Sequence, residues 1–473
     1  MIEALDKVEM NTMRTNWFLG TFEVEQARKA WASLPALASP QDRFAASVRL
    51  GVAELNQGRE AEAIALLETA LHLVINDDGR ANFRISQLGE AARHLSIAAL
   101  RLGEVENCCA RPNPDSCLLP LSSRAEHTHR RGSENAVEYL TQTLASLELG
   151  EADRGRAIWL LNIAHMTLGS HPEGVPEPWR VIFDEEQINP YSTPPFPAFT
   201  NIAEEAGVNT MSHAGGCIAD DLDGDGWPDL LVSSWDPAVP MVFFRNTGEG
   251  TFERREAGLS KIRGGLNLKQ ADYDNDGDLD VFVMRGAWLE KSGYHPNSLL
   301  QNDGNANFLD VTYAVGLAEP SFPTQTAEWL DFDLDGDLDL FVGNESNSNR
   351  IARCHLFRND EGRFTEVGRE AGVDVVGFVK GVTSGDFDGD RYPDLFLSGL
   401  TGENLLLRNR GDGTFADARD LIDGPILPVR SFPTWFFDFD NDGWLDIFVA
   451  SYDFIGLEYV NYYRGLEMSD RRI

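Results

Sequence analysis

Apolar positions follow two different periods in the two halves of the chain. From residue 22 to about residue 170, apolar and small residues recur every three or four positions, which is typical of amphipathic helices. From about residue 198, short apolar runs alternate with polar turns, which is typical of β-strands. The sequence therefore predicts a multidomain chain with an all-α domain followed by an all-β domain.

Seven prolines crowd the stretch between the two halves, from Pro172 to Pro197. Proline at this density excludes helix and favours an extended connector. We therefore predict four segments: an N-terminal segment over 1–21, a helical domain over 22–170, a Pro-rich linker over 171–197 and a β domain over 198–473.

The helical half contains one clear helix–turn–helix pattern. Within residues 49–71, small and apolar residues fall at offsets that resemble the tetratricopeptide repeat, namely Leu50, Gly51, Gly58, Ala63, Leu67 and Ala70. Small residues there let two antiparallel helices approach closely, and Gly58 lies at the expected turn. Residues 85–108 resemble a second, looser copy, and 135–147 with 156–169 read as another helix pair. A generic helical bundle is the alternative interpretation.

The β half repeats a unit of about fifty to sixty residues. Each unit has an apolar segment, an Asp-rich loop, a strand such as residues 229–234 or 446–451, a second strand, and a turn that in the first four units leads to a Phe. The Asp-rich loops, here loops 1 to 5, start at residues 221, 272, 331, 386 and 438. Several short strands per unit at this period predict five blades of a β-propeller.

All five loops share the spacing D-x-D-x-D-x-x-x-D, whose residues we number as positions 1 to 9. The twenty aspartates are Asp221, Asp223, Asp225, Asp229, Asp272, Asp274, Asp276, Asp280, Asp331, Asp333, Asp335, Asp339, Asp386, Asp388, Asp390, Asp394, Asp438, Asp440, Asp442 and Asp446. Oxygen ligands without His or Cys select Ca²⁺, whose coordination shell tolerates a flexible loop. We predict about five Ca²⁺ sites, with positions 1, 3 and 5 facing the ion, position 7 offering its carbonyl and position 9 completing the shell.

Position 6 distinguishes the fourth loop from the others. It is glycine in four loops, at Gly226, Gly277, Gly336 and Gly443, and arginine in loop 4, at Arg391. If the turn needs a left-handed backbone there, arginine costs about 1 kcal/mol. Its positive charge also repels a cation, so the site of loop 4 is predicted to be the weakest.

Two alternatives to such sites were considered. An EF-hand needs a bidentate Glu at position 12 and helices on both sides of the loop. Position 12 is apolar in every loop and lies in a strand-like run, as Val232, Val283, Val342, Leu397 and Val449. The second alternative, solvated acidic turns that bind no metal, stays open.

The loop motif followed by a strand resembles the FG-GAP/VCBS repeat of integrin-α-type propellers. Longer phrases at residues 264–289, 295–304, 323–346 and 374–382 resemble bacterial relatives of cartilage acidic protein, the ASPIC/UnbV group. Members of that group often carry tetratricopeptide-like repeats ahead of the propeller. The resemblance implies a secreted, periplasmic or cell-surface Ca²⁺-binding propeller with an adhesion or scaffold role, no established enzymatic activity, and the twenty aspartates as its ligands.

Two features depart from that family. Its members have a distinct C-terminal ASPIC/UnbV domain, for which this chain leaves no room, and related propellers usually have seven blades rather than five. We therefore expect an incomplete propeller, apparently truncated at its C-terminus. The first twenty residues also lack the apolar core of a signal peptide.

The net charge and the absence of known catalytic motifs argue against several classes of function. The 473 residues carry a net charge of −36, which argues against nucleic acid and anionic membranes as primary partners. No run of eighteen apolar residues predicts a transmembrane segment. No convincing hydrolase, metalloprotease or nucleotide-binding motif occurs. We expect a non-catalytic protein that binds a protein or glycan ligand; the alternative is a propeller-based glycan lyase or hydrolase whose acid and base remain unidentified.

One cluster outside the loops contains Cys108, Cys109 and Cys117, with His127 and His129 nearby in sequence. A loop disulfide, free thiols and a soft-metal site are all compatible with these residues, although the spacing matches no common zinc pattern.

Overall fold

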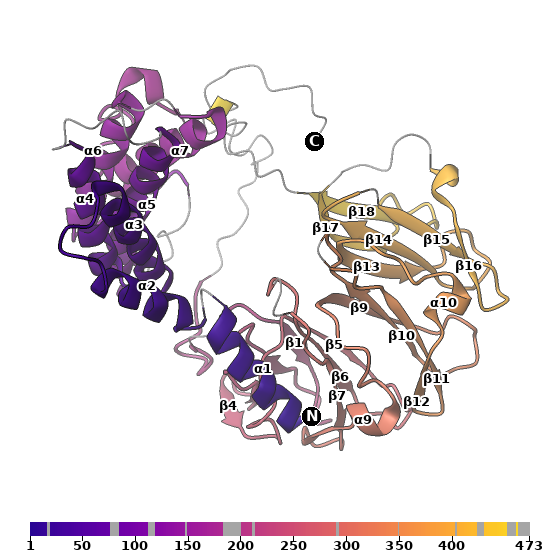
Figure 1. The fold of residues 1–473 in the computed structure, drawn as a ribbon. Coiled ribbons are helices and arrows are strands. Elements are labelled where there is room, and N and C mark those ends of the chain that lie inside the picture. The colour runs from indigo at the N-terminus through magenta and orange to yellow at the C-terminus, as the bar shows by residue number, and fades with distance from the viewer. Residues whose placement is uncertain are drawn as a thin grey trace. The chain divides into compact units, whose positions relative to one another are not determined.

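The computed structural model describes residues 1–16, 19–75, 85–111, 119–146, 149–182, 200–210, 213–289, 293–348, 350–402, 404–422, 430–451 and 460–461. The chain divides into two compact units. One contains Met1–Met13 and Ile202–Tyr452, and the other contains Arg14–Asn201 and Asp453–Ile473. The first is built mainly of strands and the second mainly of helices (Figure 1).

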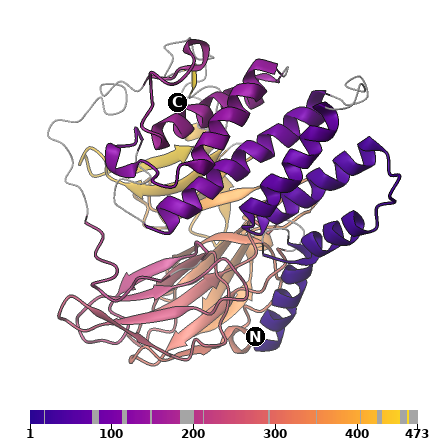
Figure 2. The same ribbon diagram turned by 90° about the vertical axis from the view of Figure 1, so that its left-hand side faces the viewer.

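The helical unit consists of helices that lie side by side (Figure 2). They are α2 (Phe22–Ala32), α3 (Pro40–Asn56), α4 (Glu60–Ile75), α5 (Ile85–Glu104), α6 (Arg131–Ser146) and α7 (Glu151–Thr167), with short helical turns at Val105–Cys109, Ser123–Ala125 and Glu177–Trp179. The buried faces of α3 to α7 contribute to an apolar core that includes Leu67, Leu95 and Leu161, and α2 packs in a smaller cluster with Leu50 of α3. The helix pair predicted from residues 135–147 and 156–169 is confirmed as α6 and α7.

The pair α3 and α4 confirms the helix–turn–helix predicted from residues 49–71. Gly58 lies in the turn with φ of 68°, a left-handed conformation that glycine adopts without strain. A Cβ placed on Gly51 would lie only 2.8 Å from Cγ of Leu67. The absence of a side chain at Gly51 therefore allows the two helices to approach closely.

Two stretches differ from the sequence-based expectation. Residues 85–104 form one continuous helix rather than a second helix–turn–helix; Gly89 lies inside this helix, and no proline interrupts it. Residues 171–182 pack on the helical unit instead of forming an extended connector, and Val175 and Val181 belong to its core. Asn162 fixes this stretch, since its Nδ2 donates to the Trp179 carbonyl at 2.8 Å and its Oδ1 accepts from the Val181 N–H at 2.9 Å. The other four prolines of the predicted linker, Pro190, Pro194, Pro195 and Pro197, lie outside the described residues.

The β unit contains five antiparallel sheets, which we call blades 1 to 5. Blades 1 to 4 have four strands each and blade 5 has two in the described residues. The strands are β1 (Cys217–Asp220), β2 (Asp229–Val232), β3 (Val242–Asn246) and β4 (Phe252–Arg255); β5 (Asn267–Ala271), β6 (Asp280–Met284), β7 (Ser298–Asn302) and β8 (Phe308–Asp310); β9 (Thr324–Leu330), β10 (Asp339–Asn344), β11 (His355–Asp360) and β12 (Arg363–Glu366); β13 (Val379–Gly385), β14 (Asp394–Gly399), β15 (Leu405–Asn409) and β16 (Phe415–Asp417); β17 (Ser431–Phe437) and β18 (Asp446–Ser451).

Strand register places every Asp loop at the same point of its blade. The residue before position 1 pairs with the aspartate at position 9, as Asp220 with Asp229 in blade 1 and Leu330 with Asp339 in blade 3. Each loop therefore closes the hairpin between the first and second strands. Position 12 lies inside the second strand of every blade, so no helix follows a loop and the EF-hand alternative is excluded.

Apolar side chains join each blade to the next. One cluster combines Phe243 of blade 1 with Phe308 of blade 2, another combines Phe282 of blade 2 with Phe364 of blade 3, and similar clusters follow to blade 5. Figure 1 shows the blades following one another in chain order. The chain thus combines a helical domain with a β-propeller-like domain, as the sequence predicts.

Two tryptophans on first strands, Trp329 and Trp435, pack differently. Trp329 packs between blades, with its ring 6.3 Å from that of Phe282 in an edge-to-face arrangement. Trp435 instead stacks at 4.3 Å on Phe448 of its own blade and remains 45% exposed.

Candidate metal centre

The carboxylate at position 1 organises the backbone of each loop. In loop 3, Asp331 accepts hydrogen bonds from the N–H groups of Asp335 and Gly336, both at 3.1 Å. Asp335 at position 5 accepts in turn from the Asp337 N–H at 2.9 Å. Equivalent bonds recur in the other four loops. The repeated aspartates therefore fix the backbone of the turn through hydrogen bonds, in addition to giving the loop its negative charge.

Two positions of every loop have a left-handed backbone. At position 6 the four glycines have φ between 87° and 98°, and Arg391 has φ of 79°. Position 4 is left-handed too, at Gly224, Asn275, Leu334, Gly389 and Asn441. The sequence analysis missed position 4, although glycine or asparagine in four of the five loops is the signal for it.

The turn does need a left-handed backbone at position 6, and Arg391 adopts this strained conformation. We expect Arg391→Gly to stabilise the chain by about 1 kcal/mol, because glycine removes the left-handed strain. Denaturant unfolding of the full chain measures this. Arg391→Lys is the matched control, since it keeps the strain and the charge; an equal gain from the lysine variant would contradict the explanation.

The aspartate at position 9 is buried between two strands in loops 1 to 4, whereas Asp446 of loop 5 is exposed. Both of its oxygens are used in loop 3, where Asp339 accepts from the N–H groups of Asn359 at 2.8 Å and Phe332 at 2.9 Å. Burial raises the pKa of Asp339 to about 8, and burial likewise raises the pKa values of Asp280 and Asp394 to about 7. Position 9 therefore holds the hairpin together, a role the sequence analysis did not assign to it.

Each loop brings three carboxylates close together. Three oxygens, one from each residue, lie within 4.8 Å of one another in every loop. The groups are Asp221, Asp223 and Asp225; Asp272, Asp274 and Asp276; Asp331, Asp333 and Asp339; Asp386, Asp388 and Asp394; and Asp438, Asp440 and Asp446. Positions 1 and 3 thus take part everywhere, joined by position 5 in loops 1 and 2 and by position 9 in loops 3, 4 and 5.

The carboxylate at position 3 carries the clearest sign of an absent partner. Its Oδ1 atom is buried and accepts no hydrogen bond in loops 1 to 4, at Asp223, Asp274, Asp333 and Asp388. The Asp223 side chain is only 7% exposed. Burial raises the pKa values of Asp274 and Asp333, and the neighbouring carboxylates add to that effect. A cation between the carboxylates would satisfy these oxygens, so the residues fit a hard, oxygen-preferring ion.

An asparagine on the third strand links each of loops 2, 3 and 4 to the loop before it, a feature the sequence analysis missed. Asn359 Nδ2 donates to the Leu338 carbonyl of its own loop at 3.1 Å and to the Tyr273 carbonyl of loop 2 at 2.7 Å. Asn302 and Asn409 make the same pair of bonds. The repeated asparagine at the end of the third strand was the available signal.

The structure describes only part of the cysteine cluster. Cys109 is a free thiol, and Cys108 Sγ lies 3.4 Å from Nε2 of the buried His127. Cys117 lies outside the described residues, so the disulfide prediction stays a prediction. Across the described ranges, the five aspartate groups are the only sets of three or more clustered candidate ligands.

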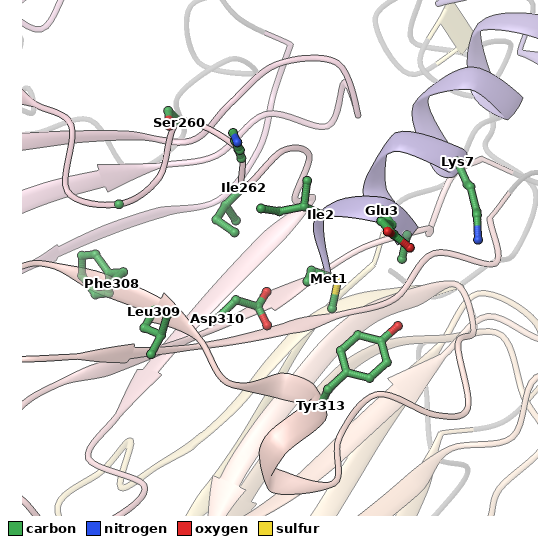
Figure 3. A pocket seen from close by; sticks show the side chains of 13 residues that line it. Met1, Ile2, Glu3, Lys7, Ser260, Ile262, Phe308, Leu309, Asp310 and Tyr313 are labelled. Atoms are coloured by element: carbon green, nitrogen blue, oxygen red, sulfur yellow. The ribbon is translucent and has the colours of Figure 1, made fainter.

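Helix α1 (Ile2–Thr15) borders a cavity of the β unit (Figure 3). The cavity measures about 730 Å³ and is lined by residues of α1, the connection between blades 1 and 2, and β8. Arg263 holds the helix there through ion pairs with Asp6 and Glu9. Asp310, which points into the cavity, accepts hydrogen bonds from the N–H and hydroxyl of Thr312 and thereby caps α9 (Thr312–Val315).

Comparison with known proteins matches this loop-and-strand unit. The family model of the FG-GAP-like repeat matches residues 221–283, 331–397 and 386–449. Each match runs from position 1 of a loop to position 12 of a loop. No helix within the described residues is long and apolar enough to cross a membrane.

The chain is also similar to cartilage acidic protein 1. The human protein is 28% identical over 213 residues, covering 42% of this chain and 30% of the relative. The Mus musculus protein is 28% identical over 247 residues, covering 49% and 35%, and the Xenopus tropicalis protein is 24% identical over 213 residues, covering 41% and 30%. The match spans about a third of each relative's length. Three stretches of the chain within residues 221–449 thus match the FG-GAP-like repeat, and part of the chain is similar to cartilage acidic protein 1.

Proposed function

We propose that the chain is a non-catalytic Ca²⁺-binding interaction protein, in which ions held by the five loops rigidify the blades. The observation that carries the proposal is the buried Oδ1 atom without a partner at position 3, which recurs in four loops. All-oxygen donor sets without His or Cys favour Ca²⁺ over the transition metals. Fivefold repetition of the cluster at the same point of each hairpin adds support.

Bound Ca²⁺ would supply positive charge to carboxylates that otherwise repel one another. The loop residues would then pass the stabilisation by the ion on to the sheet. Position 9 joins position 2 of its loop to the third strand through backbone N–H groups, and the third-strand asparagine reaches the preceding loop. Ordering one loop therefore tightens its own hairpin and its contact with the previous blade.

We also propose an extracellular, periplasmic or cell-surface location and a protein or glycan ligand. Open, exposed aspartate loops suit the millimolar to submillimolar affinities of extracellular Ca²⁺ modules. The resemblance to cartilage acidic protein 1 and the net charge of −36 are in line with this. A series of stiff blades offers broad surfaces for such a ligand.

A Ca²⁺ titration of the full chain with a competing chelator tests the proposal. We expect four or five bound ions, and one fewer in the Asp333→Asn variant, because that change removes the unpartnered oxygen of loop 3. The control is Asp337→Asn, which removes the same charge from the same loop, since Asp337 only accepts from Asn275 and Glu361. No bound ion in the wild type, or equal loss in both variants, contradicts the proposed sites.

A further inference from the structure

The residue before the third-strand asparagine differs from blade to blade, both in type and in its contact with the Asp loop. It is Arg245 in blade 1, Gln301 in blade 2, Arg358 in blade 3 and Arg408 in blade 4. In blade 5 the corresponding strand lies outside the described residues. The four blades therefore share the spacing of the aspartates but differ in the side chain at this strand position.

In blades 1 and 4 the arginine joins the aspartates at positions 3 and 5. Arg245 Nε lies 2.5 Å from Asp223 Oδ2, and its Nη2 pairs with Asp225 Oδ2. Arg408 pairs with Asp388 in the same way, and its Nη2 lies 3.2 Å from Asp390 Oδ2. Each guanidinium therefore neutralises the two carboxylates from outside and leaves the buried Oδ1 of position 3 without a partner.

Blades 2 and 3 place no guanidinium in an ion pair with these two aspartates. Gln301 Nε2 donates to Asp274 Oδ2 at 2.7 Å, so the same oxygen is held by a neutral amide. Arg358 pairs with Asp360 instead, with Nη2 and Oδ2 2.9 Å apart, and acts on Asp333 only through its charge at longer range. Asp274 and Asp333 thus keep more of their negative charge for an ion.

We propose that this third-strand residue sets the Ca²⁺ affinity of each loop. Arg245 and Arg408 act as internal counter-charges that stabilise loops 1 and 4 without metal and weaken their Ca²⁺ binding. Loops 2 and 3 bind Ca²⁺ more tightly and fill first. The inference rests on the proposed function, because it presupposes that the loops take up Ca²⁺.

The physical reason is the charge that an incoming ion meets. A guanidinium beside two ligand aspartates repels a divalent cation over a few ångströms, and the partly exposed setting screens this only in part. We therefore expect the wild-type chain to bind Ca²⁺ in two classes of sites that differ by about tenfold or more. Strain at Arg391 adds to the weakness of loop 4.

Exchanging the natural residues tests the inference in both directions. Ca²⁺ titration of the full chain should show that Arg245→Gln and Arg408→Gln each move one site from the weak to the tight class. Gln301→Arg should move one site from the tight to the weak class. Without Ca²⁺ the arginines should be stabilising. In excess chelator the two Arg→Gln variants should therefore melt at a lower temperature than the wild type, and Gln301→Arg should melt at a higher one.

Arg358→Gln is the matched control, because it removes the same charge from the same strand position but from an arginine that pairs with Asp360. It should leave both site classes unchanged. Affinities that stay within about twofold in all variants, or an equal response to Arg358→Gln and Arg245→Gln, would overturn the inference while leaving Ca²⁺ binding intact. A wild-type chain that binds no Ca²⁺ would overturn the proposed function and this inference with it.

Discussion

Removal of Ca²⁺ by a chelator should lower the thermal unfolding temperature of the β unit by about 10 °C or more. A ligand present at a hundredfold excess over its dissociation constant stabilises the folded state by about 2.7 kcal/mol per site. In a domain of this size each kcal/mol shifts the melting temperature by about 2–4 °C, so even two occupied loops reach that shift. Calorimetry of the full chain in Ca²⁺ and in excess chelator measures it.

The helical unit provides an internal control for this experiment. Hydrogen exchange should rise on chelation in loops 1 to 4 and in the strands that flank them. Exchange in α3 to α7 should stay the same, because the described residues of that unit contain no aspartate cluster. Mg²⁺ at the same ionic strength should restore little of the stability, since it demands a tighter and more regular shell. A uniform loss of protection in both units would contradict site-specific binding.

The effect of chelation should grow with pH. In the metal-free chain the pKa values of Asp280, Asp339 and Asp394 are raised to about 7, 8 and 7, far above the usual value for aspartate. A raised folded pKa stabilises the protein only while the carboxyl is protonated, so metal-free stability should fall as pH rises from about 4 to about 8. Bound Ca²⁺ replaces those protons and should remove this decline.

The sequence predicts the parts of this fold that depend on short-range patterns. Alternating aspartates followed by an apolar run predict the loops and second strands, and the glycines at position 6 indicate the left-handed turn. Each of these signals lies within about a dozen residues. The three-carboxylate groups of loops 1 and 2 could be anticipated for the same reason, because positions 1, 3 and 5 belong to one turn; in loops 3 to 5 position 9 takes the third place.

The features that sequence reasoning missed depend on distant partners. The third-strand backbone donors to position 9 come from 15 to 22 residues away. The asparagine bonds to the preceding loop span 77 to 86 residues. Helix α1 was treated as a separate N-terminal segment, yet Arg263 pairs with Asp6 and Glu9 across more than 250 residues. Hydrophobic period carries no information about such pairings, which arise only when the blades assemble.

The second large effect concerns the link between blades. Asn359→Ala should destabilise the chain by about 3 kcal/mol, because it leaves the Tyr273 and Leu338 carbonyls and the Gly362 N–H without their partner, and buried backbone groups without hydrogen bonds cost about 1–3 kcal/mol each. Asn359 is fully buried, so water does not replace its amide. Urea unfolding at saturating Ca²⁺ measures the loss.

Asn246→Ala separates the inter-blade bond from the rest of the asparagine's role. Asn246 occupies the same position in blade 1, where its amide donates to the exposed Pro228 carbonyl of its own loop and accepts from the Gly248 N–H. Its loss should cost about 1 kcal/mol, the usual net value of accessible hydrogen bonds. The difference between the two variants then measures the bond from blade 3 to loop 2. Equal losses would mean that the asparagine serves only its own turn, and that each blade responds to its ion independently of the next.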